Sequence, residues 1–182
     1  MFEVEQKHRV EDESRLVERL AERGVELRAA VEQVDRYFAH PCRDFAKTDE
    51  ALRIRTVGDK SFVTFKGPKL DTTTKTRREI ELPLDASDAG GTQFTELLES
   101  LGFKPVATVR KRRRKFDVES NGRHVEGALD DVDGVGEFVE LELLADDAGM
   151  EEAKRTVSKL ADELKLGPTE RRSYLEMLLA DR

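Results

Sequence analysis

The stretch FEVEQKHRV, residues 2–10, decides the fold, because charged and apolar side chains alternate along it. Glu3, Glu5 and Lys7 take every second position, and Val4 lies between the two acids. Successive side chains of a β-strand point to opposite faces, so this spacing places two carboxylates and an ammonium on one face. The pattern predicts a half-buried strand of an antiparallel sheet, with one charged and one apolar face.

The same alternation recurs along the chain and predicts further antiparallel strands. The Asn121-Gly122 dipeptide lies between two of these segments and is a strong signal for a β-hairpin. The segments are ALRIRTV (51–57), SFVTFKG (61–67), TRREIEL (76–82), VRKRRRKF (109–116), GRHVEGALD (122–130) and EFVELELL (137–144).

Four other segments have apolar residues at helical spacing, and three of them end at glycine. We expect the last one to begin at a Thr169 cap. The segments are DESRLVERLAERG (12–24), TQFTELLESLG (92–102), DAGMEEAKRTVSKLADELKLG (147–167) and TERRSYLEMLLADR (169–182). Helices together with antiparallel strands favour an α+β domain built on one sheet or barrel.

Composition limits the classes of function. The chain has 182 residues, a length typical of one domain, and its formal net charge of −7 argues against a general nucleic-acid or anionic-membrane binder. Cys42 is the only cysteine, which fits a reducing compartment. The charged start of the sequence predicts no signal peptide, and no apolar run approaches the ~20 residues of a membrane span. We therefore expect a cytoplasmic protein with no nucleic-acid or membrane partner.

The charged strand faces predict chemistry if the sheet closes. For one strand alone, the simplest interpretation of a charged face is contact with water. In a closed barrel these faces would line a lumen, where unpaired charge is costly. Two carboxylates ~7 Å apart on one strand can bind a hard divalent cation, while Arg and Lys bind phosphate oxygens. Acids and bases in one lumen therefore predict a metal–polyphosphate site.

The chain resembles the CYTH family, which includes class IV adenylyl cyclases and thiamine triphosphatases. The resemblance begins with the ExExK pattern of Glu3, Glu5 and Lys7 and continues in order over nearly the whole chain. The further segments are DRYF (35–38), LRIR (52–55), TFKGP (64–68), RREIE (77–81), LGFKPVATVRKRR (101–113), ALDDVDGVGEFVELE (128–142) and RSYLEMLL (172–179).

This resemblance implies a fold and a class of activity. It implies one CYTH-like domain, 1–182, with a closed eight-stranded antiparallel β-barrel, the triphosphate tunnel, and helices packed outside. It also implies an enzyme that uses Mg²⁺ or Mn²⁺ on a nucleoside or organic triphosphate. The 101–113 and 172–179 segments are most similar to class IV cyclases, which convert ATP to cyclic AMP and pyrophosphate. A triphosphatase acting on thiamine triphosphate or inorganic triphosphate is the alternative, and a non-catalytic nucleotide- or polyphosphate-binding module is another. Whether the protein forms a homodimer is left open by the resemblance.

The resemblance also assigns roles to individual residues. Arg77 competes with its neighbour Arg78 for one of the phosphate positions. Glu142 enters the metal set because it shares a strand face with Glu140. The expected metal ligands are Glu3, Glu5, Glu140 and Glu142. The expected phosphate-binding residues are Lys7, Arg53, Arg55, Lys66, Arg77, Lys111 and Arg113. The expected catalytic residues are Lys111, Arg113 and Asp130.

Overall fold

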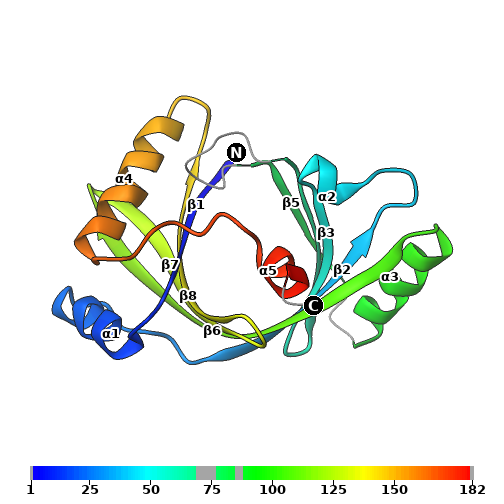
Figure 1. The fold of residues 1–182 in the computed structure, drawn as a ribbon, viewed down its shortest axis with the longest axis horizontal. Helices are drawn as coiled ribbons and strands as arrows, with labels where there is room; N and C mark the ends of the chain where they lie inside the picture. Colours follow the sequence, from blue (N-terminus) through cyan, green and yellow to red (C-terminus); the bar gives the residue numbers. More distant parts are fainter. Residues whose placement is uncertain (1, 69–76, 85–87, 181–182) are drawn as a thin grey trace.

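The structure is a computed structural model that describes residues 2–68, 77–84 and 88–180. Its strands form one antiparallel sheet in the order β1-β8-β7-β6-β2-β3-β4-β5 (Figure 1). The strands are β1 (Phe2–Arg9), β2 (Val31–Ala39), β3 (Ala51–Val57), β4 (Lys60–Lys66), β5 (Glu79–Pro83), β6 (Lys104–Ser120), β7 (Arg123–Val132) and β8 (Gly136–Ala145). Seven of these strands fall on the alternating segments, and β2 contains the DRYF motif.

The sheet is curved, but its described strands do not close into a barrel. Its two edge strands are β1 and β5, and among the described residues the link between these edges is one isolated bridge from Glu3 of β1 to Arg77, which precedes β5. A full ladder of hydrogen bonds between two strands would be needed to close a barrel. The predicted eight antiparallel strands are therefore confirmed, whereas the described part of the sheet is an open, curled one rather than the closed barrel expected from the sequence.

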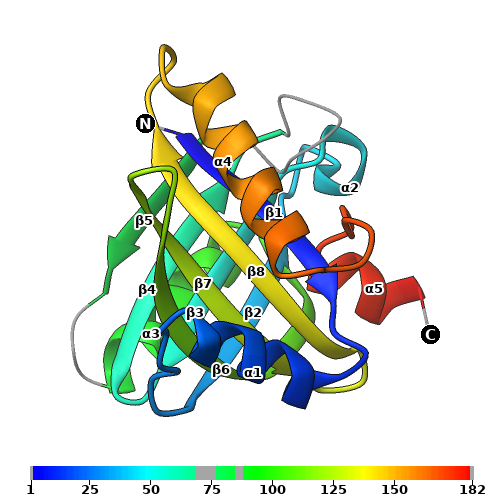
Figure 2. The same ribbon diagram turned by 90° about the vertical axis from the view of Figure 1, so that its left-hand side faces the viewer.

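Helices cover the outer, apolar face of the sheet, as predicted. α4 (Met150–Glu163) lies against β1 and β8 (Figure 2), and α1 (Glu13–Glu22) covers a lower part of the same outer face. Leu20 of α1 and Leu160 of α4 pack in one buried cluster with Val4 and Leu141 of the sheet. α3 (Asp88–Ser100) covers the other side of the curl, and α2 (Phe45–Thr48) is a short helix that the sequence did not predict. Apolar side chains thus face outward, and the alternation turns the charged ones inward.

α5 (Tyr174–Ala180) is an exception to the expected outside position of the helices. It lies on the concave side of the sheet at one end of the curl (Figures 1 and 2), where Tyr174 and Met177 pack in one buried cluster with Val109 and Phe138. The helix begins later than the predicted Thr169 cap. Ser173 supplies the cap instead, because its hydroxyl accepts from the Glu176 amide while the Glu176 carboxylate accepts from the Ser173 amide.

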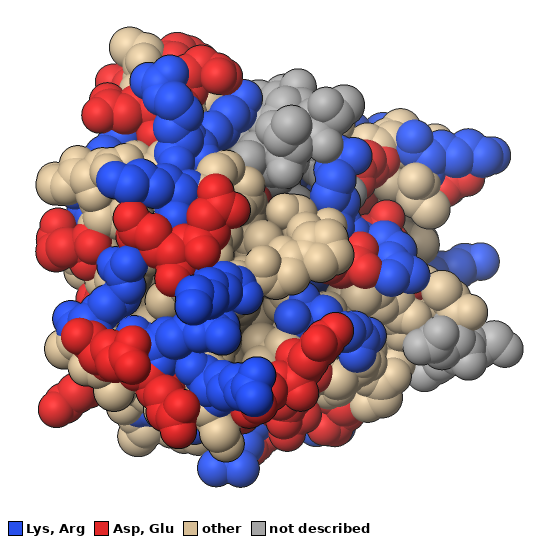
Figure 3. All heavy atoms as spheres, turned by 60° about the vertical axis from the view of Figure 1, so that its left-hand side comes forward, with Lys and Arg blue, Asp and Glu red and all other residues tan. Residues whose placement is uncertain are grey.

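The predicted hairpin between β6 and β7 is confirmed. Asn121 and Gly122 have φ angles of 51° and 68°, the left-handed values that a two-residue type I′ turn requires. Within the described residues, no helix is both long and apolar enough to cross a membrane. On the face that carries α1 and α4, basic and acidic side chains are intermingled (Figure 3).

Candidate active site

The concave face of the sheet holds a cavity of about 590 Å³. Every metal-binding and phosphate-binding residue predicted from the sequence lines it. These residues are Glu3, Glu5, Lys7, Arg53, Arg55, Lys66, Arg77, Lys111, Arg113, Glu140 and Glu142. Asp130 instead lies behind Lys111 and Arg113, with 2% of its surface exposed. Strand alternation therefore brings the whole predicted set into one place.

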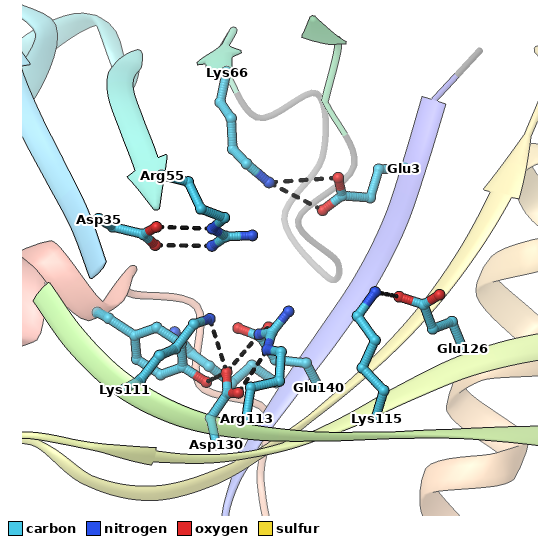
Figure 4. Close-up of polar contacts among 12 residues, drawn as sticks. Glu3, Asp35, Arg55, Lys66, Lys111, Arg113, Lys115, Glu126, Asp130 and Glu140 are labelled. Carbon is cyan, nitrogen blue, oxygen red and sulfur yellow. Dashed lines mark hydrogen bonds and ion pairs between the residues drawn. The ribbon is translucent and has the colours of Figure 1, made fainter. Parts of the chain in front are cut away.

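One wall is built by β6, β7 and β8, where a single acid contacts two bases (Figure 4). The Nζ of Lys111 donates to Oδ2 of Asp130 at 3.0 Å. Arg113 donates to the same carboxylate through Nε at 2.6 Å and also pairs with Glu140. Burial opposes the ionisation of Asp130, but the two bases outweigh it and hold the pKa of its carboxyl below the ordinary value. An ionised Asp130 fixes the direction of both bases.

Lys111 is a deeply buried lysine, with 2% of its surface exposed. Burial, and then the charge of Arg113, lower the pKa of the Lys111 ammonium to about 8, although Asp130 opposes the shift. A phosphate group bound beside Lys111 would favour the charged ammonium. The side chain is therefore placed to gain a strong ionic partner when an anion enters the cavity.

A second wall is built by β2 and β3. Asp35 of β2 accepts from Arg55 at 2.7 Å and 2.8 Å, and from Arg53 at 3.2 Å. Burial opposes ionisation of Asp35, but Arg53 and Arg55 hold the pKa of its carboxyl well below the usual range. One acid thus contacts two bases on this wall as well.

The acids gather on another part of the cavity, around β1 and β8. Glu142 lies opposite Glu5 in the ladder between these strands, and opposite Glu126 in the ladder with β7. Burial, and then the charges of Glu3 and Glu5, raise the pKa of the Glu142 carboxyl to about 8. Such mutual repulsion is typical of carboxylates arranged to share a cation.

Replacing Glu142 by Gln is expected to stabilise the metal-free protein at pH 8 but not at pH 5. The pKa of Glu142 is raised from 4.5 to about 8 in the folded chain, so the folded state binds more protons in this range. The free energy of unfolding of the wild type therefore falls as the pH rises from 4.5 to about 8, while Gln avoids this loss. Thermal unfolding at both pH values measures the effect, with Glu119→Gln at an exposed position as the control. Equal melting temperatures of the variant and the wild type at pH 8 would contradict it.

Lys66 lies among the acids. Its Nζ contacts Glu3 at 3.3 Å and Glu79 at 2.5 Å. Burial raises the pKa of Glu3, and so does the neighbouring Glu79 carboxyl, although Lys66 opposes the shift. The ammonium of Lys66 therefore occupies the position of a cation between two carboxylates.

The structure resolves the competition between Arg77 and Arg78. Arg77 is buried, lines the cavity and forms the bridge to Glu3, whereas Arg78 is exposed. The Nε of Arg77 has no hydrogen-bond partner among the described residues. A buried guanidinium N–H in this state has donor capacity for an anion.

The C-terminal segment completes the cavity. The Nζ of Lys7 donates to the carbonyl of Arg172 at 2.5 Å and lies 4.1 Å from the ring centroid of Tyr174. The hydroxyl of Tyr174 donates to Asp130 at 2.9 Å, and its ring lies 5.0 Å from the ammonium of Lys111. α5 therefore links the β1 wall to the β6–β7 wall.

This combination of fold and cavity agrees with the comparisons with known proteins. The model of the CYTH domain matches residues 1–174. The chain belongs to the CYTH family. Among its CYTH relatives is a Methanocaldococcus jannaschii protein, provisionally named an adenylate cyclase, which is 37% identical over 182 residues, 97% of this chain and 98% of the relative. Adenylate cyclase CyaB of Aeromonas hydrophila is 31% identical over 179 residues, 95% of this chain and 86% of the relative. The PH1819 protein of Pyrococcus horikoshii OT3 has a similar structure, with a TM-score of 0.86, 42% identity and 99% of each chain covered.

The carboxylate side chains of this CYTH cavity are the type of ligand that a divalent metal ion requires. Hard divalent cations prefer carboxylate oxygens, and Glu3, Glu5 and Glu142 present them on one part of the wall. As the described side chains lie, no three His, Cys, Asp or Glu residues converge closely enough to hold a metal ion. Glu3 contacts Lys66, and Glu140 contacts Arg113. The acids therefore pair with internal ammonium and guanidinium groups in this arrangement.

Sequence reasoning missed several polar residues of the CYTH cavity. Asp35 lies in the DRYF segment, but a single acid between Val34 and Arg36 gave no signal of its contact with two arginines of another strand. Lys115 and Glu126 form an ion pair on the cavity wall. Lys115 lies on the same strand face as Lys111 and Arg113, and Glu126 lies on the same strand face as Asp130. Tyr174 was not predicted as a cavity residue, because its helix was expected on the outer face of the barrel.

Proposed function

We propose that this protein is a divalent-metal-dependent adenylyl cyclase that converts ATP to cyclic AMP and pyrophosphate. The observation that carries the proposal is that one cavity combines an acidic part, a basic part and an apolar part. Each part suits a different portion of a metal–nucleotide complex. The likeness to CyaB over 95% of this chain supports the same activity.

The basic part suits the phosphate chain. Arg53, Arg55, Lys111 and Arg113 are all at least partly buried, and each is oriented by an aspartate. Guanidinium groups bind phosphate oxygens in pairs of hydrogen bonds, and a buried ammonium adds a compact charge. Side chains that are already fixed lose little entropy when the anion binds.

The acidic part suits the metal. Glu3, Glu5 and Glu142 would hold a divalent cation, which membership of the CYTH family implies. When bound, the cation supplies neutralisation of phosphate charge and a lower pKa for a coordinated hydroxyl. We expect Mg²⁺ or Mn²⁺, because both accept carboxylate ligands.

The apolar part suits an organic group. The residues that line the cavity also include the apolar Phe45, Leu175 and Leu179. Inorganic triphosphate has no apolar surface to place there, whereas a nucleoside does. This part of the wall therefore favours a nucleoside triphosphate over inorganic triphosphate.

In the proposed reaction the ribose 3′-oxygen bonds to the α-phosphorus as the bond to the β-phosphate oxygen breaks. The hydroxyl proton is released and pyrophosphate leaves. Negative charge grows on the phosphate oxygens during this step, and Lys111 and Arg113 are positioned to stabilise it. Asp130 and Tyr174 keep these bases in place.

Product analysis tests the proposal. ATP, inorganic triphosphate and thiamine triphosphate are each incubated with the protein and Mg²⁺ or Mn²⁺. We expect cyclic AMP and pyrophosphate from ATP. Release of ADP and phosphate alone, or faster consumption of inorganic triphosphate than of ATP, would replace the cyclase by a triphosphatase. Binding of ATP with no product would leave only a nucleotide-binding module.

A further inference from the structure

We propose that Asp35 is a positioning residue that orients Arg53 and Arg55 for the phosphate groups of the substrate. The inference rests on the proposed function, because it takes these arginines to bind phosphate. Asp35 has 1% of its surface exposed and lies opposite Arg55 in the ladder between β2 and β3. Arg53 and Arg55 line the cavity, and Asp35 supports them from behind.

The contact with Arg55 fixes the plane of a guanidinium group. Oδ1 of Asp35 accepts from Nε at 2.7 Å, and Oδ2 accepts from Nη2 at 2.8 Å. Two parallel hydrogen bonds of this kind leave little freedom to rotate. The remaining nitrogen of Arg55 points into the space between Lys66 and Arg113 (Figure 4). Its N–H groups are therefore held toward the middle of the cavity.

The contact with Arg53 is a single one. Oδ2 of Asp35 accepts from Nη1 of Arg53 at 3.2 Å. The Nε of Arg53 is buried and has no hydrogen-bond partner among the described residues. Buried N–H groups are nearly always satisfied in proteins, so this donor points to a missing acceptor. A phosphate oxygen would supply one.

An acid beside an anion site needs an explanation, because its charge repels the anion. Two positive charges share the one carboxylate of Asp35, so the group as a whole stays cationic. The same ratio occurs at Asp130, which contacts Lys111 and Arg113. In both places the acid reduces the net attraction but removes the rotamer freedom of long side chains. The repeat of this arrangement on two walls favours a positioning role for Asp35.

A double-mutant cycle tests the inference in the full chain. Asp35→Asn, Arg55→Ala and the double variant are compared by the KM and kcat for ATP and by the calorimetric Kd of inorganic triphosphate. We expect Asp35→Asn to raise KM and Kd by about tenfold, the scale of one lost charge-assisted hydrogen bond, with little change in kcat. In the Arg55→Ala background, Asp35→Asn should change either constant by only about twofold. Asp131→Asn, an exposed site on β7, is the control.

The outcomes separate positioning from a structural role. A structural role would reduce the folded fraction, which lowers the apparent kcat and leaves KM unchanged, and that result would overturn the inference. The inference would also be overturned if the fold-changes in KM and Kd of Asp35→Asn and Arg55→Ala multiply in the double variant. If Asp35→Asn does not fold, Asp35→Glu carries the test, since it keeps the charge but displaces the carboxylate. A raised KM then supports positioning, and a wild-type KM overturns it.

The same measurements distinguish this inference from the proposed function. A wild type that binds inorganic triphosphate but turns over no triphosphate contradicts the enzyme, while the Kd values still test Asp35. A wild type that turns over ATP, together with an Asp35→Asn variant of unchanged KM and Kd, contradicts only the positioning role. A wild type that neither binds nor turns over a triphosphate overturns both.

Discussion

Glu5→Ala protein is expected to lose metal-dependent turnover of ATP by a factor of about 10³ or more, because loss of about 4 kcal/mol of charge stabilisation has this effect on rate. Glu5 is 5% exposed and lies opposite Glu142 across β1 and β8. Removal of one carboxylate from this group weakens cation binding but also relieves repulsion between acids. The fold should therefore be kept, and the metal-free variant should melt no lower than the wild type.

Initial rates over a range of Mg²⁺ and Mn²⁺ concentrations, together with thermal unfolding, measure both effects of Glu5→Ala. Glu18→Ala, at an exposed position of α1, is the matched control and should behave as the wild type. Turnover near the wild-type level at low millimolar Mg²⁺ would show that Glu5 does not hold the cation. Loss of the folded state would assign Glu5 to stability instead.

Lys111→Met is expected to lower kcat/KM for ATP roughly 30- to 1000-fold. This factor corresponds to the loss of about 2–4 kcal/mol of transition-state stabilisation. Methionine keeps most of the volume of the side chain but removes the charge that faces the phosphate chain. The effect should be large because Lys111 is buried, where water does not screen the interaction. Asp130 keeps Arg113 as an ionic partner, so the variant should still fold.

Arg112→Met is the matched control for Lys111→Met. Arg112 is the next residue of β6, but it is exposed on the outer face of the strand. It carries the same charge, so its replacement changes the net charge equally without touching the cavity. Equal losses of kcat/KM in the two variants would indicate a general effect of charge on ATP attraction, and the assignment of Lys111 would be wrong.

Much of the fold follows from local sequence patterns, because period-two alternation is a direct consequence of strand geometry. Along β6, Lys111 and Arg113 are buried and Arg112 is exposed, as the alternation predicts for one inward face. β2 has no such pattern, because Gln33, Asp35 and Tyr37 are the residues it turns inward. That strand was not predicted from the sequence, and only the family motif DRYF marked its segment.

Sequence reasoning was less informative about closure and about α5. The two edges of the sheet are distant in sequence, so no local pattern reports whether they pair. α5 has apolar residues at helical spacing whether it covers the outer face or enters the curl. Its burial against Phe138 depends on the shape of the completed sheet. The roles of Asp35 and Tyr174 depend on the same long-range packing, which is why both were missed.

The beginning and the end of the chain contribute to one cavity, and this has a consequence for biosynthesis. β1 supplies Glu3 and Glu5, yet it forms its ladder with β8, and Tyr174 of α5 follows later still. A growing chain on the ribosome therefore exposes these acids long before Glu142 can face them. Pairing between such distant segments is also intrinsically slow. A chain that stops before α5 would carry the bases and acids without the helix that links their walls, so the cavity described above is complete only after α5 has been synthesised.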